Sequence, residues 1–120
     1  MKNRQKTALI ALRKAEQTRA IEALAKALDF AKHLEVSLFN VKEEIIAVEK
    51  RALSSPVSSL ATHLESDSLA RQVAFEKLKI LQKTYADLKK NLRIAQIEVD
   101  NAKNTVQNAA RALDAVKKLT

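Results

Sequence analysis

The hydrophobic pattern of this chain is a heptad repeat that occurs twice. With Leu24 as position a, ten successive core positions of the first half are apolar: Ala20, Leu24, Ala27, Ala31, Leu34, Leu38, Val41, Ile45, Val48 and Ala52. With Leu78 as position a, thirteen such positions follow in the second half, counting Tyr85 as apolar: Ala74, Leu78, Leu81, Tyr85, Leu88, Leu92, Ala95, Val99, Ala102, Val106, Ala109, Leu113 and Val116. A 3.5-residue repeat places such side chains on one stripe of a helix, so the pattern predicts two long coiled-coil helices.

Residue usage agrees with a fold that has few turns. The 120 residues include no glycine and one proline, and turns with positive φ normally need glycine. The absence of cysteine excludes disulfides and favours a reducing compartment. The longest early apolar run, residues 8–12, is too short for a signal peptide or a membrane span. We therefore expect a cytoplasmic protein that is not inserted in a membrane.

A serine-rich stretch around Pro56 separates the two seams. Run backward from Ala74, the second frame meets Arg71 and Asp67 at core positions, so its regular part begins near residue 70. We expect a single domain over 1–120, with helices over about 4–53 and 68–119 and a connector over about 54–67, the second helix being capped by Ser66, Asp67 or Ser68. A short helical turn within the connector is also compatible with the sequence.

The two arms are nearly equal in length, which favours a chain that folds back on itself. The predicted fold class is all-α, a two-helix antiparallel coiled-coil hairpin in which facing residue numbers add to about 122. The alternative is one continuous helix that forms a dimer. Pro56 disfavours it, because proline removes a backbone hydrogen bond and restricts the residue before it. The first frame also breaks before Ala20, at Gln17 and Arg13.

The net charge of +8 is concentrated near the termini. Residues 1–20 hold six basic side chains and one acidic, residues 101–120 hold four and one, and the other 80 residues balance. A hairpin brings both termini to one end, which we call the basic end. We expect it to bind a partner through Lys2, Arg4, Lys6, Arg13, Lys14, Arg111, Lys117 and Lys118. Alternatively, these side chains only keep frayed helix ends soluble.

A second candidate surface lies near the predicted connector. Phe39, Ile46 and Leu53 recur every seven residues at position b, and Phe75 at position e belongs to the same flank. A two-helix hairpin has no third layer to cover them, so we predict that these four residues dock a partner. Self-association into a four-helix bundle and a connector folded over the flank are the alternatives, and they leave monomer and homodimer open. A further c stripe on the opposite flank comprises Val73, Ile80 and Ile94.

No set of residues predicts catalysis, and no cofactor or metal is expected. Glu43 and Glu44 are adjacent and point about 100° apart on a helix. His63 and Asp67 have i, i+4 spacing but lack a third ligand. Without glycine there is no phosphate-binding loop. Nucleic acid ranks second as a partner, because no aromatic platform accompanies the basic residues.

The run 9-LIALRKAEQTRAIEALAKAL-28 resembles the first arm of the FliJ/YscO family. These are the central stalk proteins of flagellar and type III secretion export ATPases, and the match comprises Leu9, Leu12, Arg13 and Glu16. The aromatic residues often found near the family's N-terminus are missing, and the short chain favours the secretion-system branch.

The resemblance implies a non-enzymatic stalk or adaptor. The basic end would enter a hexameric ATPase ring, and the flank with Phe39 and Phe75 would contact an export-gate protein or a chaperone. The protein would then act in the cytoplasm, peripherally at the export apparatus of the inner membrane. A nucleic-acid-binding coiled coil and a purely structural oligomerisation module remain as alternatives.

Overall fold

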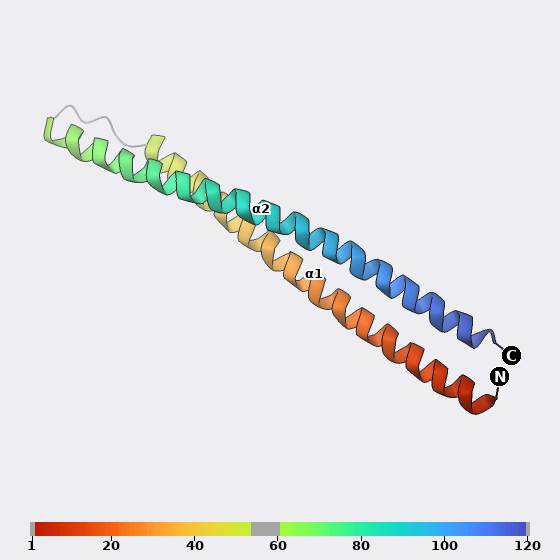
Figure 1. The fold of residues 1–120 in the computed structure, drawn as a ribbon. Helices are drawn as coiled ribbons and strands as arrows, with labels where there is room; N and C mark the ends of the chain where they lie inside the picture. Colours follow the sequence, from red (N-terminus) through yellow and green to blue (C-terminus); the bar gives the residue numbers. More distant parts are fainter. Residues whose placement is uncertain (1, 54–60, 120) are drawn as a thin grey trace. The chain divides into compact units, whose positions relative to one another are not determined.

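The chain forms two long helices that pack against each other. The computed structural model describes the backbone of residues 2–53 and 61–119, and the side chains of residues 2–52 and 68–119. Helix α1 spans Asn3–Leu53 and helix α2 spans Ala61–Lys117 (Figure 1). No strand occurs in these described ranges. The predicted all-α helical hairpin is confirmed.

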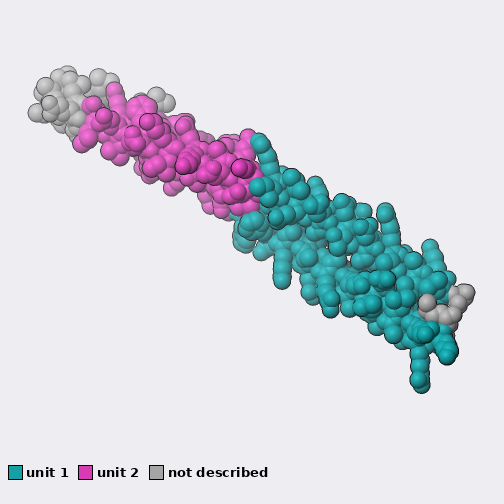
Figure 2. Space-filling model, viewed as in Figure 1, with its two compact units in different colours: residues 1–33, 92–120 teal, residues 34–91 magenta. Residues whose placement is uncertain are grey.

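Each part of the hairpin pairs a segment of α1 with a segment of α2. Unit 1 consists of residues 1–33 and 92–120, and unit 2 consists of residues 34–91 (Figure 2). Both termini belong to unit 1, where the helices run in opposite directions (Figure 1). The pairing of early with late residues is what an antiparallel fold-back requires.

The two predicted seams form the helix interface. All 23 of their side chains are buried or half-buried. The buried hydrophobic side chains all belong to the seams: Ala20, Ala31, Val48, Leu81, Ala95, Val99, Leu113 and Val116. Burial of this apolar stripe stabilises the paired helices at roughly 25 cal/mol per Å² removed from water. The heptad pattern thus predicted the core residue by residue.

The predicted break of the first frame before Ala20 is wrong. Gln17, Arg13, Ile10 and Lys6 continue the same spacing, and all four are half-buried along α1. Long polar side chains can occupy such positions because their aliphatic stems lie along apolar surface while the polar ends reach water. The seam therefore extends to the first turns of α1, where it contains both polar and apolar residues.

The second helix begins earlier than the sequence predicted. α2 starts at Ala61, seven residues before the expected start at 68, so Ser66, Asp67 and Ser68 lie within the helix instead of capping it. A polar residue at a core position removes an apolar contact but leaves the backbone hydrogen bonds intact, so a break in the seam does not end a helix. Pro56 lies outside the described residues.

Chemical cross-linking tests the antiparallel register. Ala52 and Ala70 line one pocket, and their numbers add to 122, as the fold-back predicts. The chain has no native cysteine, so Ala52→Cys with Ala70→Cys gives one defined pair of thiols. A short bis-maleimide should join them within one chain, as seen by mass spectrometry. Ala52→Cys with Ala86→Cys should react poorly, because residue 86 lies about 24 Å further along α2. Cross-links formed only between chains would contradict the hairpin.

Candidate partner-binding surfaces

Unit 1 holds nearly all of the excess charge. It contains 13 basic and 6 acidic side chains, whereas unit 2 contains 9 and 8. All eight residues of the predicted basic end belong to unit 1. Six of them are exposed: Lys2, Arg4, Lys14, Arg111, Lys117 and Lys118. The structure therefore brings the two basic termini together in one unit, on two antiparallel helices.

Arg13 and Lys6 differ from the other six. Both are half-buried at positions that continue the seam. The Arg13 Nη1 atom lies 2.9 Å from Oε2 of Glu16, one turn along α1, and the side chains are 35% and 39% exposed. The buried Nε of Arg13 has no hydrogen-bond partner among the described residues. Because Arg13 is already paired with a carboxylate, it is a poor candidate for binding a separate acidic partner.

The apolar flank near the connector carries two grooves. Phe39 and Phe75 are 61% and 60% exposed, while Ile46 is half-buried. The side chain of Leu53 lies outside the described residues. A groove of about 450 Å³ is lined by Glu49, Ala52, Arg71, Phe75 and Leu78. A groove of about 240 Å³ is lined by Glu35, Leu38, Phe39, Lys42 and Tyr85. All ten of these residues occupy heptad positions a, e or b, so both grooves lie on one flank of unit 2.

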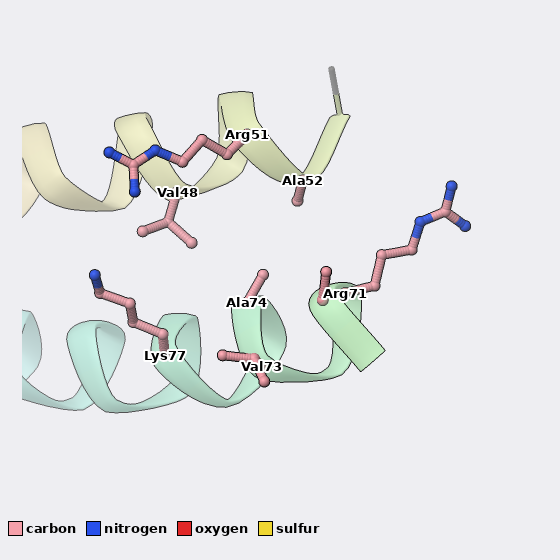
Figure 3. Close-up of a pocket in the computed structure, with 8 residues that line it drawn as sticks. Val48, Arg51, Ala52, Arg71, Val73, Ala74 and Lys77 are labelled. Atoms are coloured by element: carbon pink, nitrogen blue, oxygen red, sulfur yellow. The ribbon is translucent and has the colours of Figure 1, made fainter. Parts of the chain in front are cut away.

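A third hollow lies on the opposite flank of unit 2, where the residues occupy mainly positions d, g and c. It has a volume of about 330 Å³, and Figure 3 shows it between the two helices. Its floor consists of Val48, Ala52, Ala70 and Ala74. Its rim carries Arg51, Arg71, Val73 and Lys77. The sequence analysis did not predict this basic rim. A signal for it was present, because Arg51 and Lys77 both occupy position g, and g positions of two antiparallel helices lie along the same edge of the pair.

Chemistry at single residues is sparse in the described part of the chain. No group of three or more His, Cys, Asp or Glu side chains there is arranged to hold a metal ion. His33 is exposed on α1, with Nε2 3.5 Å from a carboxylate oxygen of Asp29. Within the same residues, neither helix has an apolar stretch long enough to cross a membrane. The surfaces described above are thus the features on which a function can be argued.

Comparison with known proteins adds no relative to this picture. No protein-family model, no curated protein and no solved structure matches the chain.

Proposed function

We propose that the protein is a non-enzymatic adaptor whose basic end binds an acidic surface of a protein partner. The observation that carries this proposal is the charge of unit 1, which contains 13 basic and 6 acidic side chains and combines the start of α1 with the end of α2. A concentrated positive field attracts an acidic surface and speeds its association.

The position of the cations at the start of α1 supports a binding role. Lys2, Arg4 and Lys6 lie at or before the first turns of α1, and the first turn has no acidic residue. The positive end of the helix dipole favours acids there, and a single charge near a helix end changes stability by about 0.3–1 kcal/mol. These cations act against helix stability, so stability does not account for their presence. Lys117 at the end of α2 is different, because the dipole favours a cation there.

The specific form of the proposal is a central stalk for an export ATPase of the type III secretion kind. The basic end of unit 1 enters the central hole of the hexameric ring. The flank of unit 2 with Phe39 and Phe75 contacts an export-gate protein or an export chaperone. The protein then works at the cytoplasmic face of the inner membrane. The match of Leu9, Leu12, Arg13 and Glu16 to the FliJ/YscO opening supports this form, and the ion pair between Arg13 and Glu16 gives two of those residues a structural role.

The salt dependence of binding tests the adaptor proposal. We expect the affinity for a purified hexameric export ATPase, measured by calorimetry, to fall about tenfold between about 0.05 M and 0.3 M salt, because salt screens exposed charges. Binding that stays unchanged over this range would contradict a charge-driven contact.

Nucleic acid is tested in parallel, since phosphates attract the same cations. A gel shift with duplex DNA and single-stranded RNA at about 0.15 M salt should show no complex if the partner is a protein. A nucleic-acid complex without ATPase binding would replace the adaptor by a nucleic-acid-binding coiled coil.

A further inference from the structure

We propose that the hollow on the opposite flank of unit 2 is a second docking site, for an amphipathic helix of another protein. Acidic side chains of that helix pair with Arg51 and Lys77, and its apolar side chains cover Val73 and Ile80. The site is separate from the basic end of unit 1. It shares Ala52 and Arg71 with the groove beside Phe75, and its other lining residues lie on the opposite flank of unit 2.

The floor of the hollow is apolar and comes from both helices. Val48 is 5% exposed, and Ala52, Ala70 and Ala74 surround it with short side chains. Because alanine has no atoms beyond Cβ, the facing helices leave a space of about 330 Å³ between them. That volume is at the lower end of the range for ligand pockets, about 300–1,000 Å³. It suits a large apolar side chain presented by a partner helix.

The rim makes the hollow selective for negative charge. Figure 3 shows Arg51 from α1 and Lys77 from α2 on the same side of the hollow, whereas Arg71 points away. Among the side chains that the structure describes, no carboxylate lines the hollow and no ion pair involves Arg51 or Lys77. Arg51 lies in the last turn of α1, where the helix dipole favours a cation. Lys77 lies inside α2, so the dipole does not explain it.

The apolar surface beside the hollow has the spacing of a helix-binding face. Val73 is 61% exposed at the rim, and Ile80 is 66% exposed seven residues further along α2. Both occupy position c, so they lie on one stripe about 10.5 Å apart along the helix axis. A partner helix with apolar residues at i, i+3 or i+4, and i+7 presents anchors at the same interval.

Charge argues against a second copy of this chain as the occupant. A two-fold symmetric contact places the same patch of each subunit against itself. Through this face it would bring Arg51 and Lys77 towards the same cations of the other copy. Like charges at an interface disfavour that pairing. The occupant that fits is a different helix with acidic residues beside its apolar stripe.

Two synthetic helical peptides test the site on the full chain. They share leucines at i, i+3 and i+7, and their flanking positions carry only glutamate in one and only lysine in the other. Fluorescence anisotropy should show that the acidic peptide binds at least about tenfold more tightly than the basic one. Equal affinity of the two peptides, or no binding of the acidic one, would overturn the proposal without any variant being made.

Variants then locate the binding. Arg51→Glu with Lys77→Glu should reverse the preference and admit the basic peptide. Lys50→Glu with Lys83→Glu makes the same change in net charge at exposed outer positions and should leave the preference as it is. If both double variants behave alike, net charge alone governs binding and the site is wrong.

The apolar contact is tested separately. Val73→Ser with Ile80→Ser should weaken binding of the acidic peptide about tenfold. The control variant, Leu69→Ser with Ile97→Ser at exposed f positions, should bind this peptide as the wild type does. The wild type should also be tested for self-association. If it self-associates, and if Val73→Ser with Ile80→Ser abolishes this while the control variant does not, the occupant is a second copy of the chain and the proposal is wrong. The residues of the proposed site all belong to unit 2, so their substitution tests this site independently of ATPase binding by the basic end.

Discussion

Ala95→Asp should destabilise the hairpin more than any other single change proposed here. Ala95 is 1% exposed, the least of the buried seam residues, and lies in α2 of unit 1. Aspartate is too short to bring its carboxylate from that position to water, so the substitution buries an unpaired charge between the helices. Such a charge costs about 3–5 kcal/mol. Thermal unfolding followed by circular dichroism should show a large fall in Tm.

A matched control separates burial from helix propensity. Ala25→Asp makes the same replacement in the middle of α1, in the same unit, at an exposed position. In both variants, replacing alanine by aspartate lowers the intrinsic helix propensity by the same amount, about 0.7 kcal/mol. Ala25→Asp should therefore lower the free energy of unfolding by no more than about 1 kcal/mol. Equal losses in the two variants would contradict a seam closed around Ala95.

The heptad frame predicted the interface because periodicity alone decides which side of a helix is apolar. Every predicted seam position, from Ala20 to Ala52 and from Ala74 to Val116, is buried or half-buried. The frame did not predict that Arg13 and Gln17 would continue the seam. The identity of a residue gives the polarity of the end of its side chain, whereas the aliphatic stem of a long polar side chain can still pack along apolar surface.

The start of the second helix could not be located from the apolar seam alone. The sequence places the start of the second helix where regular apolar spacing begins, near residue 70, but α2 begins at Ala61. Backbone hydrogen bonds extend a helix past its last core contact whenever no residue stops it. Proline is the one strong breaker available, and Pro56 precedes Ala61 in the sequence.

Some features of the candidate surfaces could be predicted from the sequence, and others could not. Clustering of charge near the termini and the exposure of Phe39 and Phe75 followed from composition and heptad position. The ion pair of Arg13 with Glu16 and the volume of the alanine-lined hollow came from the structure, whereas the two cations on the rim of the hollow could have been found from their g positions.

Reversing charge at the start of α1 tests the central claim, that the basic end binds an acidic partner. The variant Lys2→Glu, Arg4→Glu and Lys14→Glu leaves the Arg13–Glu16 pair in place. Glutamates at residues 2 and 4 suit the positive end of the helix dipole, so helix stability should hold or rise. The control Lys83→Glu, Lys89→Glu and Lys90→Glu makes the same change in net charge at exposed positions of unit 2.

The decisive measurement is calorimetric titration of a purified hexameric export ATPase with the wild type and these two variants. We expect the variant at residues 2, 4 and 14 to bind about a hundredfold more weakly, because each reversal turns an attraction into a repulsion. The control should bind within about threefold of the wild type. Equal affinity of all three proteins for the ring would contradict the claim that the basic end carries the contact.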